Sequence, residues 1–261
     1  MKKIRIYILL FLLLFTLTSC NDQEYINKHF SNTFNLTAEE DQVRELLTKA
    51  GLPVVSTEVK LPGMAFVGTD NYKGEYMLTE HLVETHKCKN IVYLSGIDGN
   101  KEDAIRRQAV EDCLKKHKME LMDIIHGDFG YYVGRQRINE WIEKNKKVPD
   151  AFICANDQMA LSTIAFLKQM GVKVPEEVIV SGFDNISAGR VFSPSLATVD
   201  QNYQMQGMEC AKIVAEVVNN RKLVKKSIIP TRLSPGESCG CIDCKGEVAL
   251  RKQIGCANWE K

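Results

Sequence analysis

Short apolar runs alternate with helical segments along most of the chain, and this alternation limits the possible folds more than any other feature. Apolar runs typical of strands lie at 91–94, 151–155 and 178–180, and apolar residues at helical spacing fill the segments between them, such as 102–117. Continuous apolar strands are typical of parallel sheets, because helices cover such sheets on both faces. The pattern therefore predicts an α/β fold with mostly parallel sheets.

Polar or aromatic side chains follow the predicted strands directly. Asn156, Asp184 and Gln201 each come after an apolar strand, and so does Phe129. Arg106 lies in the first turns of a helix that follows another strand. Ligands of open α/β sheets bind beyond the carboxyl ends of the strands. These five positions are therefore the candidates for a binding site.

Four segments of the chain resemble motifs of a known family. They are VGTDNYKG at 67–74, ANDQMA at 155–160, VPEEVIVSGFD at 174–184 and PSLATVDQ at 194–201. In this order and spacing they resemble the sugar-binding domain shared by ribose-type periplasmic binding proteins and lactose-repressor-type (LacI/GalR) regulators. The resemblance covers roughly residues 40 to 236. It implies a two-lobe type I periplasmic-binding-protein fold, joined by hinge strands and closing on a ligand.

The resemblance also implies roles for individual residues. Arg106 stands where the family has an arginine that forks onto sugar hydroxyls, although Ala109 and Val110 replace the usual glycine and aromatic residue. Asn156 and Asp184 match residues that hydrogen-bond the ring hydroxyls. Sugar hydroxyls both donate and accept, so amide, carboxylate and guanidinium groups suit them.

Three further positions complete the predicted ligand set. Phe129 matches an aromatic residue that stacks on the apolar face of a sugar ring, for which an aromatic plane is suited. Gln201 matches a ligand contact on a hinge strand. Glu58 matches, more loosely, a carboxylate from the first lobe.

The first lobe departs from the family pattern. The family has about two further βα units and a strand before the helix at 40–50, so we expect an incomplete first lobe that exposes apolar surface or is completed by a partner. The predicted division is a signal at 1–20, a tether at 21–38, a partial first lobe at 39–97, a second lobe at 98–200, a helix returning to the first lobe at 201–222, a last hinge strand at 223–236 and a cysteine-rich tail at 237–261.

The amino terminus has the pattern of a secretory signal. Lys2, Lys3 and Arg5 precede an apolar run at 6–15, which is shorter than the roughly 20 residues of a membrane span. Cys20 follows Leu-Thr-Ser, which resembles a bacterial lipobox whose cysteine is acylated. We therefore expect a lipid-anchored, extracytoplasmic protein of the cell envelope, with an uncleaved signal anchor as the alternative.

Four of the nine cysteines cluster in the tail: Cys239, Cys241, Cys244 and Cys256. They could ligate zinc or form disulfides, or the SCGC sequence could only mark the end of the domain. His81 and His86 lie five residues apart in a predicted helix, which would place them on different faces, so no histidine metal pair is expected.

Three charged residues have simpler structural roles as alternatives. Asp70 and Asp157 each stand at the start of a predicted helix and are expected to cap it. Arg106 could bridge to Glu102 or Asp103 on the surface of its helix instead of contacting a ligand.

Charge and motifs narrow the function. The formal net charge is +1, with no basic excess to grip a phosphate backbone, so no direct nucleic-acid binding is expected. The sequence carries no HExxH, glycine-rich phosphate loop or Ser-His-Asp pattern, so we expect no enzyme and no cofactor.

The predicted function is extracytoplasmic binding of a small, sugar-like solute for uptake or sensing, with an ABC permease or a membrane sensor as partner. The alternative is the ligand-sensing domain or fragment of a LacI/GalR-type transcriptional regulator or of a membrane signalling protein, without its DNA-binding or output module.

Overall fold

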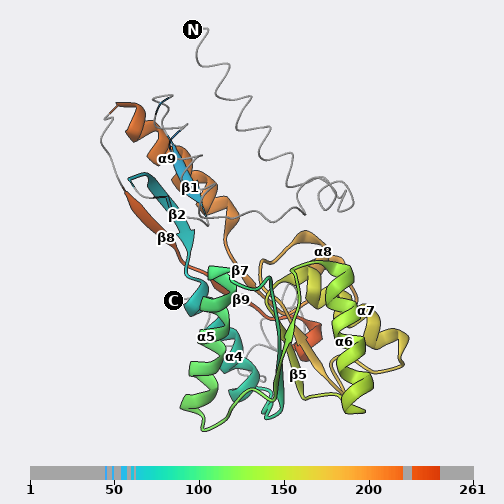
Figure 1. Ribbon diagram of the computed structural model, residues 1–261. Helices are drawn as coiled ribbons and strands as arrows, with labels where there is room; N and C mark the ends of the chain where they lie inside the picture. The colour runs from blue at the N-terminus through green and yellow to red at the C-terminus, as the bar shows by residue number, and fades with distance from the viewer. Residues whose placement is uncertain are drawn as a thin grey trace, which may run out of the picture. The chain divides into compact units, whose positions relative to one another are not determined.

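The structure is a computed structural model that describes residues 45, 49, 54–57, 60–61, 63–219 and 225–241 (Figure 1). The predicted signal with Cys20, the tether, Glu58 and the tail cysteines Cys244 and Cys256 lie outside the described residues. The chain divides into two units, Met1–Val54 and Val55–Lys261, and the architecture below is that of the second unit.

Four parallel strands form the larger sheet. Its order is β4-β3-β5-β6, with bounds Asp123–His126 (β4), Ile91–Ser95 (β3), Ala151–Cys154 (β5) and Ile179–Ser181 (β6). Every residue of β3, β5 and β6 is buried. This burial explains why these strands are continuous apolar runs, and it confirms the predicted α/β fold with parallel sheets.

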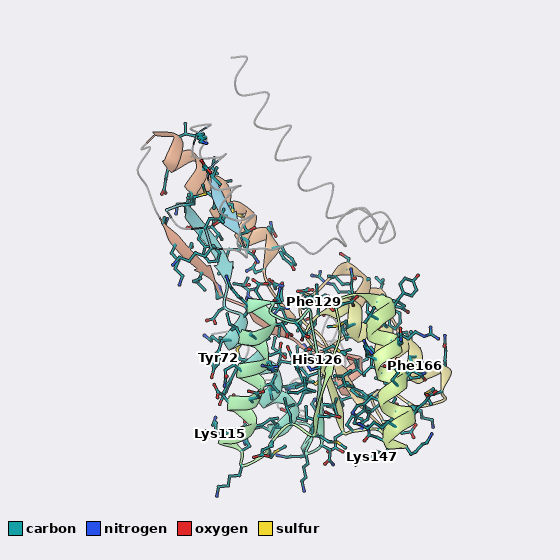
Figure 2. The ribbon with its side chains drawn as sticks, in the orientation of Figure 1. Tyr72, Lys115, His126, Phe129, Lys147 and Phe166 are labelled. Carbon is teal, nitrogen blue, oxygen red and sulfur yellow. The ribbon has the colours of Figure 1, made fainter. Side chains whose placement is uncertain are left out.

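Helices cover both faces of the larger sheet. Their bounds are Asn71–Glu84 (α4), Lys101–Lys116 (α5), Tyr131–Asn145 (α6), Asp157–Gln169 (α7) and Ser187–Val191 (α8). In Figure 1, α4 and α5 lie together on one side of the strands and α6 and α7 on the other. Figure 2 shows the same separation in its labelled side chains, with Tyr72 and Lys115 on the side of α4 and α5 and Phe166 on that of α6 and α7.

The start of α7 corrects one expectation. Asn156, not Asp157, caps this helix: its backbone is extended, and its Oδ1 accepts a hydrogen bond from the amide of Met159 at 3.0 Å. Asp157 is the first helical residue and is fully buried. Its carboxylate accepts hydrogen bonds from the Thr198 hydroxyl and from the Ile186 amide, so it joins α7 to two neighbouring segments. The expected cap at Asp70 is present, with the amide of Lys73 at 3.0 Å.

A second, smaller sheet has three parallel strands in the described residues. Its order is β1-β2-β8, with bounds Val55–Thr57 (β1), Ala65–Thr69 (β2) and Lys226–Ile229 (β8). Helix α9 (Tyr203–Asn219) packs on it through Cys210 and Ile213. Helix α9 also exposes Met205, Met208 and Val218.

An antiparallel strand pair connects the two sheets. It consists of β7 (Thr198–Asp200) and β9 (Arg232–Ser234), and a 3₁₀ turn, η1 (Glu237–Cys239), follows β9. Bridges from Ser181 to Ala197 and from Asp184 to Asp200 continue the ladder of the larger sheet toward this pair. The chain thus passes between the sheets at β7 and β9.

Two predicted boundaries differ from this arrangement. The first lobe was expected to extend to residue 97, but β3 is a central strand of the larger sheet and α4 packs against α5. The chain leaves the smaller sheet at the end of β2, where Asp70 starts the helix. The stretch 223–236 holds two strands, β8 and β9, instead of one. Pro230 separates them, because proline has no amide hydrogen for the ladder.

Among the described residues, no helix combines the length and apolar character that crossing a membrane requires.

Candidate ligand-binding site at the carboxyl ends of the strands

Arg106 is the centre of the candidate site. Its side chain is only 4% exposed, its Nε donates to Oδ1 of Asn71 at 2.8 Å, and its Nη1 donates to the carbonyl of Ala155 at 2.6 Å. The guanidinium carbon lies 3.8 Å from the centre of the Phe183 ring. Oε2 of Glu102, the alternative partner, lies 3.7 Å from Nη2 of Arg106, which is farther than the acceptors on Asn71 and Ala155. Arg106 therefore joins α4, α5, the end of β5 and the loop after β6.

Asp103, the other alternative partner of Arg106, has a different role. It accepts hydrogen bonds from the Tyr93 hydroxyl and from the Gly96 amide, both at 2.9 Å. These bonds fix the carboxyl end of β3. Burial, with the nearby carboxylates of Glu75 and Asp103, raises the pKa of Tyr93 well above its usual value.

Asn156 and Phe129 meet at the ends of β5 and β4. The Asn156 side-chain amide donates to the carbonyl of Phe129 at 2.9 Å. Phe129 has a φ of 67°, and its ring lies against Gly96, where an added Cβ would be 2.0 Å from a ring carbon. Only glycine fits there, so Gly96 positions the aromatic ring. The strand pattern of the sequence gives no signal for this role of Gly96.

Asp184 and Gln201 meet at the hinge. The side-chain amide of Gln201 donates to Oδ1 of Asp184, and the hydroxyl of Thr69 in β2 donates to Oε1 of Gln201 at 3.2 Å. Asp184 has a φ of 125°, a conformation that is costly for a side chain other than glycine and that recurs at ligand sites. Gln201 therefore connects the loop after β6 with the smaller sheet.

Glu75 is a buried carboxylate that sequence reasoning missed. It is completely buried in α4, and within the described part of the chain neither of its oxygens has a hydrogen-bond partner. Burial raises its pKa to about 8, although the charge of Arg106 acts in the opposite direction. Burial likewise raises the pKa of Asp157 to about 6, against the hydrogen bond from Thr198. The only sequence signal was the position of Glu75 one helical turn after Asn71, on the face that packs inward.

The structure brings five of the six predicted ligand residues to neighbouring strand ends. Arg106 donates to the carbonyl of Ala155, next to Asn156, and stacks on Phe183, next to Asp184. Asn156 donates to the carbonyl of Phe129, and Gln201 donates to Asp184. The sixth, Glu58, lies outside the described residues. The guanidinium, two amides, carboxylate and aromatic plane gathered here suit a polyhydroxylated ligand.

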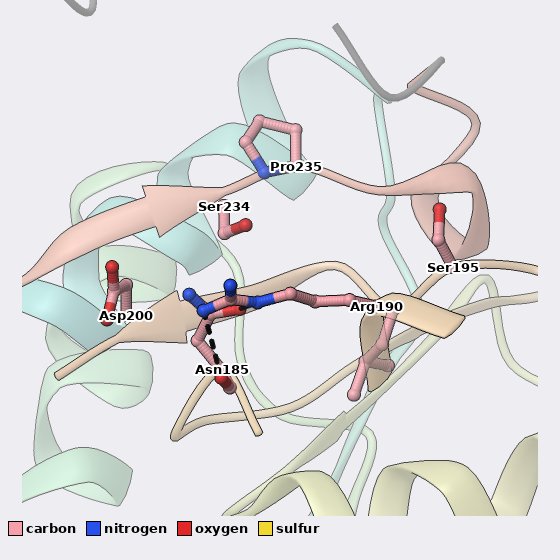
Figure 3. Close-up of a pocket in the computed structure, with 7 residues that line it drawn as sticks. Asn185, Arg190, Ser195, Asp200, Ser234 and Pro235 are labelled. Carbon is pink, nitrogen blue, oxygen red and sulfur yellow. Dashed lines mark hydrogen bonds between the residues drawn. The ribbon is translucent and has the colours of Figure 1, made fainter. Parts of the chain in front are cut away.

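A separate polar pocket lies beside β7 and β9 (Figure 3). Its volume is about 240 Å³, below the roughly 300–1,000 Å³ of typical ligand pockets. It is lined by Asn185, Arg190, Ser195, Leu196, Asp200, Ser234 and Pro235. Arg190 Nε donates to Oδ1 of Asn185 at 3.0 Å across it. The predicted ligand residues are not among those that line this pocket, so the strand-end site stays the better candidate.

The structure also gathers metal-binding side chains at another place. Cys239 and Cys241 lie against His81 and His86, whose Nε2 atoms are 3.1 Å apart. The expectation that these histidines point to different faces is wrong, because α4 ends at Glu84 and His86 lies beyond the helix. A hydrogen bond with Cys241 and bonds with both imidazoles lower the pKa of Cys239, against the effect of burial.

These features define the class. A parallel α/β sheet with polar groups at its strand ends, linked through a crossing strand pair to a smaller parallel sheet, is the type I periplasmic-binding-protein fold. A family model described as the periplasmic binding protein-like domain matches residues 79–239. The chain belongs to this family.

Curated relatives are transcriptional repressors. The HTH-type transcriptional repressor PurR of Histophilus somni is 29% identical over 154 residues, which are 58% of this chain and 46% of that protein. PurR of Actinobacillus pleuropneumoniae serotype 3 is 30% identical over 153 residues, which are 56% of this chain and 44% of that protein. The chain spans about half the length of the curated relatives it matches.

Solved structures of similar fold include ligand complexes. A transcriptional regulator CelR–cellobiose complex is 26% identical with a TM-score of 0.67, covering 76% of this chain and 62% of that one. A periplasmic binding protein/LacI transcriptional regulator from Alkaliphilus metalliredigens, complexed with D-xylulofuranose, is 26% identical with a TM-score of 0.64, covering 71% and 70%. A LacI family regulator from Enterococcus faecium with bound ribose is 22% identical, has a TM-score of 0.70 and covers 78% and 76%, which shows the shared fold.

The comparisons change the weight of the functional expectations. The relatives are LacI-type regulators and not enzymes, so they favour the alternative of a regulator's ligand-sensing domain over solute uptake. They also run against the expectation that nucleic acid is no partner, since the curated relatives are HTH-type repressors.

Proposed function

We propose that this chain is the ligand-sensing domain of a LacI/GalR-type regulator and that it binds a small polyhydroxylated molecule at the carboxyl ends of β3 to β6. The observation that carries the proposal is the convergence of Arg106, Asn156 and Asp184 on neighbouring strand ends. Arg106 and Asp184 supply charged hydrogen-bonding groups, Asn156 supplies an amide, and Phe129 supplies an aromatic plane. The cellobiose and D-xylulofuranose complexes of relatives support a sugar-like ligand.

The hydrogen bonds of Gln201 suggest how binding is sensed. Gln201 links Asp184 on the larger-sheet side to Thr69 in the smaller sheet. A ligand hydroxyl that donates to the Asp184 carboxylate replaces the hydrogen bond from Gln201. The ligand then binds one arrangement of the two sheets more tightly than the other. A ligand can shift such an equilibrium only by its differential affinity for the two arrangements.

A thermal-shift screen with titration calorimetry tests the sugar proposal. The full-length chain is screened against pentoses, hexoses and disaccharides, and binding is expected to raise the melting temperature as ligand concentration exceeds Kd. Asp184→Asn is expected to weaken binding at least tenfold. Arg190→Lys, in the separate polar pocket, is the matched control and should bind normally. A folded protein that binds none of these sugars would contradict the proposal.

A second candidate function rests on the amino-terminal sequence. The positive residues, the apolar run at 6–15 and Cys20 support an extracytoplasmic, lipid-anchored receptor that binds a solute for uptake or signalling. In that case the output partner is an ABC permease or a membrane sensor, and not DNA. Metabolic labelling with a tagged fatty acid separates the two functions. Label on the wild type and its loss in Cys20→Ala support the anchored receptor, whereas an unlabelled wild type supports the regulator.

A further inference from the structure

Two histidines and two cysteines from distant parts of the chain meet in the interior. Their ligand atoms all lie within 4.8 Å of one another. Cys241 Sγ is 3.5 Å from Nε2 of both His81 and His86, and Cys239 Sγ is 3.8 Å from Nε2 of His81. Three of the four residues are buried, and His86 is partly buried.

These separations agree with the edges of a zinc tetrahedron. With Zn–S near 2.3 Å and Zn–N near 2.0–2.1 Å, tetrahedral geometry puts ligand atoms roughly 3.3–3.8 Å apart. The three sulfur–nitrogen separations given above are 3.5–3.8 Å and lie in this range, while the two histidine nitrogens, 3.1 Å apart, are slightly closer than the edge between two nitrogen ligands. Thiolate and imidazole are also the ligands that zinc prefers.

The turn after β9 is fixed so that both thiols face α4. The amides of Cys239 and Cys241 both donate to the carbonyl of Gly236 at 3.2 Å, and Gly240 between them is left-handed, with a φ of 84°. The hydroxyl of Ser238 donates to the carbonyl of Val180 in β6. The turn is therefore held on the larger sheet.

The other half of the site is the end of α4. His81 lies in its last turn, and His86 folds back beyond the helix so that the two rings pack edge to face with centres 4.7 Å apart. Four residues separate the histidines, as in known zinc sites. One residue separates the cysteines, fewer than the usual two to four, and the left-handed Gly240 makes this short spacing possible.

We propose that His81, His86, Cys239 and Cys241 form a Cys₂His₂ site for a structural zinc ion. Four protein ligands leave no open position, which is the arrangement of structural and not catalytic zinc. The metal would tie the segment after the hinge strand β9 to the end of α4. The site is independent of the proposed sugar binding, since its residues and those of the strand-end site are different.

Metal analysis of the full-length chain, purified under reducing conditions, is the direct test. One zinc per chain is expected by mass spectrometry. Replacement with Co²⁺ should give the visible bands of tetrahedral cobalt and a near-ultraviolet thiolate charge-transfer band of the intensity of two thiolates. Single variants His81→Gln, His86→Gln, Cys239→Ser and Cys241→Ser should each lower zinc content at least tenfold after dialysis.

Three matched controls define the site. His117→Gln removes a ligand from the other group of metal-capable side chains in the described residues, with Glu80 and Glu84, and should keep its zinc. Cys210→Ser removes a buried cysteine of the smaller-sheet core and should keep it too. Cys244→Ser with Cys256→Ser tests the alternative site made only of tail cysteines, and this double variant should also retain one zinc.

Several results would overturn the proposal. One is a wild type that holds no stoichiometric zinc or cobalt after reconstitution. Another is a Cys239–Cys241 disulfide in the protein purified with reductant, found by peptide mapping. A third is zinc that survives in the histidine variants and is lost from the tail double variant. If a ligand variant fails to fold, the cobalt spectrum of the wild type still decides, because its charge-transfer intensity counts the thiolates.

Discussion

The strand-end site and the His/Cys cluster are built from the chain in opposite ways. Except for Arg106, which comes from helix α5, each described residue of the strand-end site lies a few positions after a strand, and the parallel strands β5 and β6 place Asn156 and Asp184 at one edge of the sheet. The His/Cys cluster joins two histidines to two cysteines that come more than 150 positions later in the chain, and it needs the hinge strand β9 to return beside α4. Strand ends that share an edge can be found from local sequence, whereas a cluster closed by the last turn of the fold cannot.

Metal removal is expected to produce the largest difference between the two regions. Chelation should lower the free energy of unfolding by at least about 3 kcal/mol, which for a domain of this size is roughly 6–12 °C in melting temperature. Sugar affinity should change less than twofold, because the hydrogen bonds of Arg106 do not involve the cluster. Calorimetry with and without chelator measures both quantities. Loss of sugar binding on chelation would show that the two regions are coupled.

The buried carboxylate of Glu75 should make stability fall as pH rises. Between about pH 4.5 and 8 the unfolded chain has released this proton and the folded chain still holds it, so each pH unit favours unfolding by about 1.4 kcal/mol. From pH 6.5 to 8 the expected loss is about 2 kcal/mol. Asp157, with a pKa of about 6, acts mainly below this window.

Glu75→Gln mimics the protonated carboxyl and should remove this slope. Urea unfolding at pH 6.5 and 8 measures the slope, and the difference between variant and wild type isolates the contribution of residue 75. Glu143→Gln, on an exposed position of α6, is the control and should keep the wild-type slope. Equal slopes in the wild type and in Glu75→Gln would show that Glu75 is already ionised in the folded protein.

Gly96→Ala tests the packing that positions the aromatic ring. The added Cβ would lie 2.0–2.4 Å from carbons of the Phe129 ring, so the ring must move. We expect a loss of about 1–3 kcal/mol in stability and at least a tenfold loss in sugar affinity. Gly207→Ala in α9 has no atom within 4 Å of its new Cβ and should instead stabilise by about 0.5–1 kcal/mol. Normal sugar binding by Gly96→Ala would remove Phe129 from the ligand site.

The outline of the larger sheet could be predicted because its strands carry their own signal. Runs such as 91–94 and 151–155 are apolar at every position, and only a strand covered on both faces needs that. The passage between the two sheets had no comparable signal. The chain goes directly from β2 into α4 through the single residue Asp70, so the boundary was placed one strand too late.

The parts of the two sites that were missed depend on contacts between distant residues. The spacing of His81 and His86 misled because it assumes a helix through residue 86, whereas α4 ends at Glu84. Glu75 was missed because burial without a partner is a property of the packed interior and not of a motif. Gly96 became significant only once the Phe129 ring was seen against it.

The smallest expected effect separates a helix cap from a ligand contact. Asp70 and Asn156 both cap helices of the larger-sheet region through bonds of 3.0 Å to a backbone amide, so each change to alanine should cost about 1 kcal/mol. Asn156 also bonds the carbonyl of Phe129, and Asp70 has no equivalent contact with the aromatic residue. Titration calorimetry should therefore show at least a tenfold loss of sugar affinity in Asn156→Ala and less than a twofold change in Asp70→Ala. Equal affinities in the two variants would reduce Asn156 to a structural cap and leave Arg106 and Asp184 as the polar centre of the site.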